Sequence, residues 1–291
     1  MNKNTANAIL LISCPDKRGI TACVTDFIYK HNGNVEHADQ HVDKEQAVFF
    51  MRIEWSLEGF DIDRDDIAGL LKPLAEQYNM TWKLYFSDEL PSIALFVSKQ
   101  LHCIADLLYR YKAGDLRAEI PIVVSNHEDA RQLVEAYGIK FFHIEKTREN
   151  CDKKETEELS VLKKYNIETV VLARYMQVLS EKFVSLYDNN IINIHHSFLP
   201  AFMGAKPYEQ AYKRGVKIIG ATSHYVTPDL DAGPIIEQDV VRISHRDSID
   251  DLKKKGADLE KVVLSRAVRW HLDRKLLVYG EGENTKTVVF D

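Results

Sequence analysis

The sequence has little of several features that would place it in a specialised structural class. Of its 291 residues, 13 are Gly and 8 are Pro, too few for a collagen-like or disordered chain. No apolar run approaches the roughly 18 residues that a membrane-spanning helix needs. The apolar stretch near the N-terminus, 8–14, is too short for a signal peptide. We therefore expect a globular protein of the cytoplasm that has no membrane partner.

Cysteine and positive charge are also scarce. The four Cys residues lack CxxC spacing, which predicts neither a zinc site nor a redox dithiol. The formal net charge is −6, which disfavours a nucleic-acid partner. All of this net charge falls within residues 1–90, so the two parts of the chain differ in character. Because 45% of the residues are hydrophobic, the chain has enough apolar material for two ordinary domains.

Short strands and helices alternate within residues 1–86. Apolar alternation predicts strands and helical spacing predicts helices, in the order strand 8–13, helix 19–31, strands 34–42 and 47–55, helix 64–78 and strand 80–86. This βαββαβ order is typical of a ferredoxin-like domain. The polar segment 87–92, SDELPS, reads as a linker.

Residues 93–291 show a longer alternation of apolar strands and amphipathic helices. This pattern predicts an α/β domain with a doubly wound, mostly parallel sheet covered on both faces. Two apolar runs close together, 217–226 and 234–243, predict an antiparallel addition to that sheet. Residues 248–271 then predict a long helix.

The richest chemistry follows the predicted strand 191–195. In open α/β sheets ligands bind beyond the carboxyl ends of the strands. Asn193 and His195 alternate onto one face of that strand, while His196 is expected to face the other way. An amide donor and an imidazole on one face can polarise a carbonyl and stabilise its oxyanion.

A proton-transfer group is expected from the loop TPDLDAGPIIEQ, 227–238. This loop carries two acids, Asp229 and Asp231, and a carboxylate here could orient His195 and order a water molecule. Together these residues predict acyl or formyl transfer without a covalent enzyme intermediate. The alternative is purely structural: Asn193 and Asp231 form turns, and His195 satisfies a buried contact.

Three rival sites are weaker. Adjacent strand residues such as His195 and His196 face opposite ways, which disfavours a metal. Cys103 follows His102 on a predicted helix, where neighbours diverge by about 100°, so a structural thiol is favoured. The turn 97–100 has no glycine and is a poor cradle for a dinucleotide or phosphate. We therefore expect neither a metal nor a resident cofactor.

Long blocks in this sequence resemble those of one enzyme family. The blocks are HCIADLLYR (102–110), SNHED (125–129), LARYMQVLS (172–180), NIHHSFLPAFMGAKPYEQA (193–211) and IGATSHYVTPDLDAGPIIEQDV (219–240). They are similar to the formyltetrahydrofolate deformylases, whose catalytic domain has the folate-dependent formyltransferase fold. These enzymes hydrolyse 10-formyltetrahydrofolate to tetrahydrofolate and formate, which balances one-carbon pools and supplies formate for purine biosynthesis.

The resemblance assigns roles to particular residues. It implies a catalytic trio of Asn193, His195 and Asp231, with water as the attacking group. It also implies a folate pocket, with the substrate-binding residues Tyr175, Met176, Gln177, Leu179, Val226 and Asp229.

The segment CPDKRGI, 14–20, resembles the ligand-binding turn of an ACT domain. ACT domains share the βαββαβ order and commonly bind small amino acids. The resemblance implies an effector such as methionine or glycine, held near Asp16 and Gly19, where a helix N-terminus favours a carboxylate. An exposed sheet edge also predicts self-association into a homo-oligomer.

Two other functions stay open at this point. One is a formyltransferase that passes the formyl group to an amine on a small molecule. The other is a non-catalytic sensor of folate or amino acids, which would bind ligand without turnover.

Overall fold

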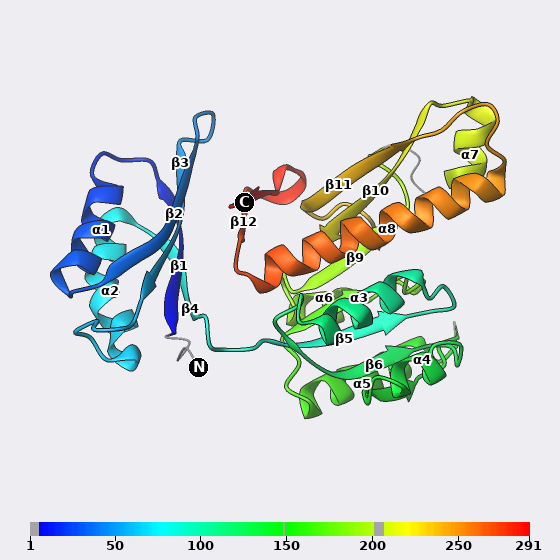
Figure 1. Ribbon diagram of the computed structural model, residues 1–291, viewed down its shortest axis with the longest axis horizontal. Helices are drawn as coiled ribbons and strands as arrows, with labels where there is room; N and C mark the ends of the chain where they lie inside the picture. The colour runs from blue at the N-terminus through cyan, green and yellow to red at the C-terminus, as the bar shows by residue number, and fades with distance from the viewer. Residues whose placement is uncertain (1–5, 148, 201–206) are drawn as a thin grey trace. The chain divides into compact units, whose positions relative to one another are not determined.

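The computed structural model describes residues 6–147, 149–200 and 207–291. The chain divides into two compact units (Figure 1). Unit 1 comprises Met1–Leu90, Arg274–Leu277 and Val288–Asp291, and unit 2 comprises Pro91–Asp273 and Val278–Thr287. Among the described helices, none combines the length and the apolar character needed to cross a membrane.

Unit 1 has the predicted βαββαβ order. Its elements are β1 (Asn7–Pro15), α1 (Ile20–Lys30), β2 (Asn34–Asp43), β3 (Val48–Ser56), α2 (Arg64–Tyr78) and β4 (Thr81–Phe86). The four strands form one antiparallel sheet in the order β2-β3-β1-β4. The ferredoxin-like prediction is confirmed.

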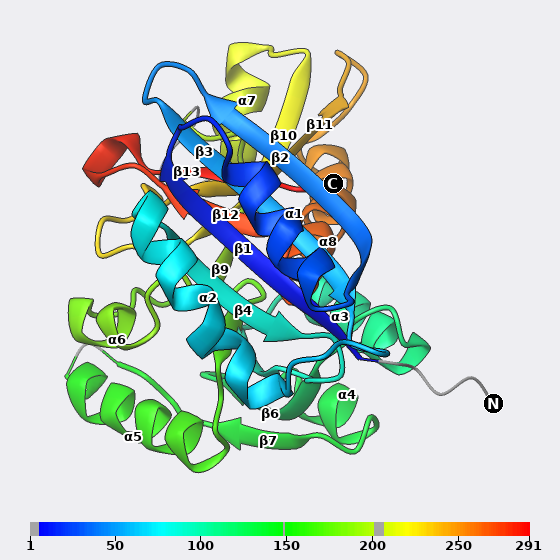
Figure 2. The ribbon, with the colours of Figure 1, turned by 90° about the vertical axis from the view of Figure 1, so that its left-hand side faces the viewer.

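The core of unit 1 lies between the sheet and its two helices. Both helices cover the same face of the sheet (Figures 1 and 2). Leu10 of β1 stands opposite Ile53 of β3, and both are buried. Val24 of α1 and Leu71 of α2 belong to the same apolar cluster. Because side chains alternate along a strand, every second residue of the central strands reaches this core.

The end of the chain returns to unit 1. Arg52, which is only 4% exposed, donates from Nε to the carbonyl oxygen of Arg274 at 3.1 Å. The Arg274 guanidinium in turn lies 4.2 Å from the ring centre of Tyr85. Phe290 is buried, and its backbone N–H donates to Lys275. The sequence analysis assigned all of 93–291 to one domain. The hydrophobic pattern of residues 274–291 gives no sign that parts of this segment pack in unit 1.

Unit 2 alternates strands and helices. Its elements are β5 (Ser92–Val97), α3 (His102–Ala113), β6 (Glu119–Ser125), α4 (Arg131–Glu135), β7 (Lys140–His143), α5 (Cys151–Lys164), β8 (Thr169–Leu172), α6 (Glu181–Leu186), β9 (Ile191–His195), α7 (Pro207–Arg214), β10 (Ile218–Tyr225), β11 (Ile235–Arg242), α8 (Ile249–Leu272), β12 (Leu276–Tyr279), a short 3₁₀ turn (Gly282–Asn284) and β13 (Lys286–Val289). Strands β12 and β13 straddle the division between the units.

The central sheet of unit 2 has seven strands in the order β11-β10-β9-β8-β5-β6-β7. Strands β7, β6, β5, β8 and β9 are parallel, whereas β10 and β11 pair antiparallel at one edge. The predicted antiparallel addition is therefore confirmed. Strand β7, with the sequence KFFH, was not predicted, because four residues flanked by charge carry too weak a pattern.

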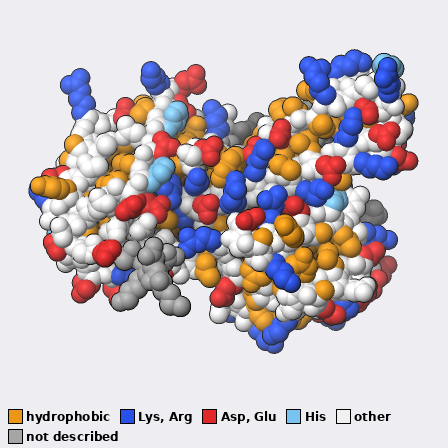
Figure 3. Space-filling view, in the orientation of Figure 1, with side chains coloured by type: hydrophobic (Ala, Val, Ile, Leu, Met, Phe, Trp, Pro, Cys, Tyr) orange, Lys and Arg blue, Asp and Glu red, His pale blue; other side chains and the backbone are white. Residues whose placement is uncertain are grey.

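Helices pack on both faces of this sheet, as the doubly wound prediction requires. Phe96 of β5 contacts Phe183 of α6, with ring centroids 6.2 Å apart. On the other face His271 of α8 hydrogen-bonds Thr169 of β8 at 3.0 Å. On the face shown in Figure 3, basic and acidic side chains are interspersed along α8 rather than gathered into one patch.

Candidate active site

Two strands at the antiparallel edge of the sheet position the central polar residues. Asn193 and His195 lie at the carboxyl end of β9 and share one face, as expected. His224 of β10 stands opposite Asn193 in the antiparallel register. Backbone pairing between the two strands therefore fixes the relative position of Asn193 and His224.

Asp231 comes from the loop that connects β10 to β11. Its φ of +55° lies in the left-handed region, which is unfavourable for a residue with a side chain. Gly233 is buried, and a Cβ atom there would stand 1.8 Å from the carbonyl oxygen of Tyr225. Glycine thus lets the loop approach β10 closely, and this approach aims the Asp231 carboxylate at the ends of the strands.

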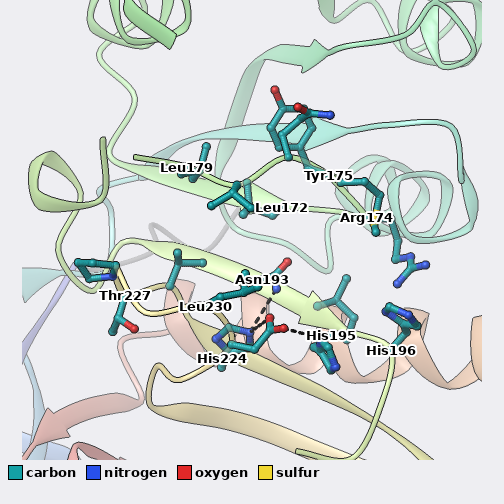
Figure 4. A pocket seen from close by; sticks show the side chains of 17 residues that line it. Leu172, Arg174, Tyr175, Leu179, Asn193, His195, His196, His224, Thr227 and Leu230 are labelled. Carbon is teal, nitrogen blue, oxygen red and sulfur yellow. Dashed lines mark hydrogen bonds and ion pairs between the residues drawn. The ribbon is translucent and has the colours of Figure 1, made fainter. Parts of the chain in front are cut away.

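The Asp231 carboxylate lies between the imidazoles of His195 and His224, both of which are labelled in Figure 4. Its Oδ2 is 3.2 Å from Nδ1 of His195, and its Oδ1 is 3.6 Å from Nε2 of His224. The hydrogen bond from His195 holds the pKa of Asp231 well below its ordinary value. Asp231 is therefore an anion at any physiological pH.

His224 orients the amide of Asn193. Nδ1 of His224 is 2.8 Å from the carbonyl oxygen of Tyr225, which only accepts, so Nδ1 carries a proton. In the neutral ring Nε2 is then an acceptor, and it lies 3.2 Å from Nδ2 of Asn193. One N–H of the Asn193 amide is engaged in this way. The second N–H is left to bind a substrate oxygen.

His195 has one nitrogen available for chemistry. Its side chain is 6% exposed, and Nδ1 faces Asp231. Nε2 is fully buried and has no hydrogen-bond partner among the described residues. A buried polar atom without a partner is costly unless a ligand or water satisfies it. This atom is the feature of the site that most clearly calls for a bound substrate.

A cavity of about 450 Å³ opens beside these residues. Its size lies within the range of small-molecule sites. The cavity brings the predicted trio together with five of the six predicted substrate-binding residues: Tyr175, Met176, Gln177, Leu179 and Val226. The Asp229 side chain is exposed and does not border the cavity. Leu230 does border it, and this residue was not among the predicted ones.

A buried polar network supports the segment 174–180, which forms one wall of the cavity. Tyr175 donates its hydroxyl to Glu158 at 2.6 Å, and Lys146 contacts the same carboxylate at 2.7 Å. Ser180 donates to Glu155 of the same helix, α5, and caps α6. On the other side the Met176 N–H donates to Ser98 at 3.0 Å. None of this network was predicted beyond Tyr175 itself.

His196 departs from the sequence expectation. The ring was expected to face away from His195, but the two ring centroids lie 5.2 Å apart, and His196 also borders the cavity. The reason is local: β9 ends at His195, so strand alternation does not extend to His196. Residues 201–206 of the block 193–211 lie outside the described residues.

One cluster has the composition of a metal site. His102, Cys103 and Glu260 offer ligand atoms within 4.8 Å of one another. Both Glu260 oxygens already accept hydrogen bonds, one from Tyr208 and one facing His102, each at 2.7 Å. Burial raises the pKa of the Cys103 thiol well above its ordinary value, so this group stays protonated. The cluster is therefore satisfied from within.

The predicted effector residues lie at the start of α1. Gly19 precedes the helix with a φ of +93° and, as a glycine, has no side chain with which to cap it. The Asp16 N–H donates to Ala47 at 2.8 Å, which holds the turn against the start of β3. Asp16 and Gly19 are both exposed, so the N–H groups of the first helical turn lie next to solvent.

The hydrogen bond between His224 and Asn193 leads to the first prediction. In the variant His224→Phe the Asn193 amide loses the partner that orients it, while the strand pairing remains. We expect kcat to fall about tenfold with little change in KM, because orientation matters most in the transition state. Steady-state kinetics of the folded variant measure both values. A rise in KM alone would mean that His224 only shapes the cavity.

Comparisons with known proteins agree along the whole chain. The family model "Formyl transferase" matches residues 92–268, and the model "ACT domain" matches residues 8–76. The formyltetrahydrofolate deformylase of Synechocystis sp. is 54% identical over 97% of this chain and 98% of its own length. That of Bacillus subtilis is 48% identical over 97% of this chain and 93% of its own length. The crystal structure of a formyltetrahydrofolate deformylase from Pseudomonas syringae superposes with a TM-score of 0.96 at 44% identity, covering 100% of this chain and 96% of that one.

Proposed function

We propose, from the premise that the chain belongs to the formyltetrahydrofolate deformylase family, that Asn193, His195 and Asp231 carry out its reaction. The protein hydrolyses 10-formyltetrahydrofolate to tetrahydrofolate and formate. The observation that carries the assignment of the trio is the buried Nε2 of His195, which has no partner among the described residues and belongs to a side chain that borders the cavity. In the cell this reaction balances one-carbon pools and supplies formate for purine biosynthesis.

The mechanism follows from the donors at the cavity. The free N–H of Asn193 and, in the protonated ring, Nε2–H of His195 donate to the formyl oxygen as it becomes an oxyanion. Asp231 holds His195 through Nδ1 and orders the attacking water. Water oxygen adds to the formyl carbon, the carbon–nitrogen bond breaks, and N10 takes one proton. The second proton of water leaves to solvent, and formate remains.

The folate would occupy the largely apolar cavity. Tyr175, Met176, Gln177 and Leu179 would form one wall, and Val226 with the loop to Asp229 would form the other. A flat heterocycle needs apolar contact on its faces and a few polar groups at its edges. The side chain of Asp229 is exposed. In this proposal Asp229 therefore contacts the substrate through its backbone, or contacts the part of the substrate that extends out of the cavity.

Hydrolysis is favoured over transfer to a phosphate-bearing amine. The turn after β5 is where such a phosphate would need a cradle. There Ser98 donates to Asn126 at 2.7 Å and accepts from Met176, while Gln100 accepts from Arg174 at 2.9 Å. These polar groups are already used inside the protein. A non-catalytic sensor is disfavoured because it would not need the strained Asp231 backbone.

Unit 1 would regulate the enzyme. A small amino acid such as methionine or glycine would bind with its carboxylate near Asp16 and Gly19, at the uncapped start of α1. The edge strand β2, most of whose residues are exposed, would pair copies of the chain into a homo-oligomer. Cytoplasmic localisation fits the four Cys residues, all free thiols, because that compartment is reducing.

Formate release from 10-formyltetrahydrofolate, with no amine acceptor present, tests this function. We expect steady release over many turnovers by the purified full chain, and a changed rate when methionine or glycine is added. Consumption of 10-formyltetrahydrofolate that requires an amine, and that stops once all of the amine is formylated, would instead establish a transferase. Folate binding without any turnover would establish the sensor.

A further inference from the structure

A second cavity adjoins the first in unit 2. It too has a volume of about 450 Å³, and Arg174 and His196 border both cavities. Its other walls come from the turn after β5, from α7 and from α8, and none of the proposed catalytic trio lines it. The mechanism above leaves this space unused.

Arg174 is the dominant charged group where the cavities adjoin. It follows β8 with a φ of +64°, and only 7% of its side chain is exposed. Its Nε donates to Gln100 and lies 3.4 Å from Glu260. All hydrogen bonds of the guanidinium to described residues use Nε, so within this part of the chain the N–H groups of both Nη atoms have no acceptor. In Figure 4 this guanidinium is drawn beside the His196 ring, at one end of the first cavity.

The surrounding charges leave Arg174 able to bind an anion. Glu260 is its nearest carboxylate, but that group is also engaged by His102 and Tyr208. Burial, and then the charge of Arg174, lowers the pKa of His196 to about 4, so its ring is neutral near pH 7. The cavity lining also includes Lys253 and Lys254 of α8 and Glu209 of α7, which together add one net positive charge.

Formate is the ligand whose chemistry suits this position. The first cavity is lined mainly by apolar side chains, which solvate a small anion poorly. A guanidinium with free Nη groups binds a carboxylate through parallel N–H···O bonds. Arg174 borders both cavities, so its guanidinium lies next to the cavity in which the formyl carbon reacts.

We propose that the second cavity is the formate site. Formate, produced when water adds to the formyl carbon and the bond to N10 breaks, binds at the Nη groups of Arg174. It then leaves through this cavity while tetrahydrofolate still fills the first. The inference rests on the proposed function and deepens it, because it gives the two products separate sites and separate exits.

Binding of [¹³C]formate to the full chain, followed by NMR in the presence of saturating tetrahydrofolate, tests the proposal. We expect formate to bind while tetrahydrofolate stays bound. Ala257 of α8 lines the second cavity only, so the variant Ala257→Phe fills that space. It should weaken formate binding at least tenfold and leave tetrahydrofolate binding unchanged. In turnover it should lower kcat and KM together and leave kcat/KM unchanged, because the release of product follows the chemical step.

The matched control is Asp258→Phe, which places the same ring on the next residue of α8, where the side chain is 75% exposed. Formate affinity should stay at the wild-type value. Should Ala257→Phe fail to fold, Ala257→Leu fills part of the same space and should weaken formate binding severalfold. Wild-type affinity in the folded Ala257 variant, or displacement of formate by tetrahydrofolate, overturns the proposal.

The two proposals fail separately. Formate binding is measured without turnover, so it does not depend on hydrolysis being observed. A protein that binds formate at Ala257 but releases none from 10-formyltetrahydrofolate contradicts the proposed function alone. A protein that hydrolyses the substrate but shows no formate site sensitive to Ala257 contradicts this inference alone.

Discussion

Replacing Asp231 by Asn should lower turnover at least about a hundredfold while tetrahydrofolate still binds. The amide has nearly the same volume, but it carries no charge. Its oxygen can still accept from His195, and its NH2 group can face the acceptor Nε2 of His224, so the substitution removes charge rather than contact. His195 would therefore lose the anion that stabilises its protonated form. Formate release and a separate measurement of tetrahydrofolate affinity check the two parts of the expectation.

The pKa of Asp231 gives this prediction a pH dependence. Because the folded-state pKa lies below the unfolded value of about 3.9, the interaction stabilises the fold above that pH. The contribution is lost as the pH falls toward the folded value. The variant should therefore lose stability near pH 7 and lose less at pH 3. An equal loss at both values would show that the ion pair with His195 is not the cause.

Asp229→Asn is the matched control. It makes the same chemical change two residues away in the same loop, at an exposed side chain that does not border the cavity. We expect kcat within about twofold of wild type, with any change confined to KM. A loss as large as that of Asp231→Asn would mean that the loop's total charge matters rather than the contact with His195.

Lys146→Met should destabilise unit 2 by about 3–5 kcal/mol. The ammonium of Lys146 is completely buried and contacts Glu158 at 2.7 Å and Glu155 at 3.7 Å. Without it, two carboxylates remain in the interior with no cation. Because Glu158 also accepts from Tyr175, the wall of the folate cavity should loosen and KM should rise. Denaturant unfolding and steady-state kinetics measure these effects.

This loss should also depend on pH. Burial already raises the pKa of Glu158, and removing Lys146 should raise it further. Protonation of Glu158 removes the uncompensated charge, so the variant should lose less stability at pH 5 than at pH 8. Lys154→Met, which breaks an exposed pair with Glu157 on the same helix, should cost under about 0.5 kcal/mol. A similar cost for the two variants would mean that the buried pair contributes no more than a surface one.

The site residues that could be predicted from the sequence are those whose arrangement depends on a single strand. Asn193 and His195 could be assigned to one strand end because alternation is a local property. The spacing alone left Asp229 and Asp231 open, and the resemblance to a known family selected Asp231. His224 escaped notice, since its place opposite Asn193 depends on an antiparallel register that only the folded sheet defines.

Buried charge was the other feature that sequence reasoning missed. In the sequence, Glu155 and Glu158 look like solvated surface residues, because carboxylates are rarely buried. Their burial depends on Lys146, which lies in a connection outside α5. Arg174 was missed for a similar reason. Its partners Gln100 and Glu260 are distant in sequence and meet it only in the fold.

The return of the chain's end to unit 1 bears on how the protein is made. Residues 274–277 and 288–291 belong to the unit that begins at the N-terminus. During synthesis the first 90 residues leave the ribosome early, yet the acceptor of the buried Arg52 Nε, the carbonyl group of Arg274, emerges only after residues 91–273 of unit 2. The N-terminal unit is thus completed after most of unit 2. A nascent chain or a fragment that stops before Arg274 lacks the acceptor of that Nε, and Glu54 still pairs with Nη2 of Arg52.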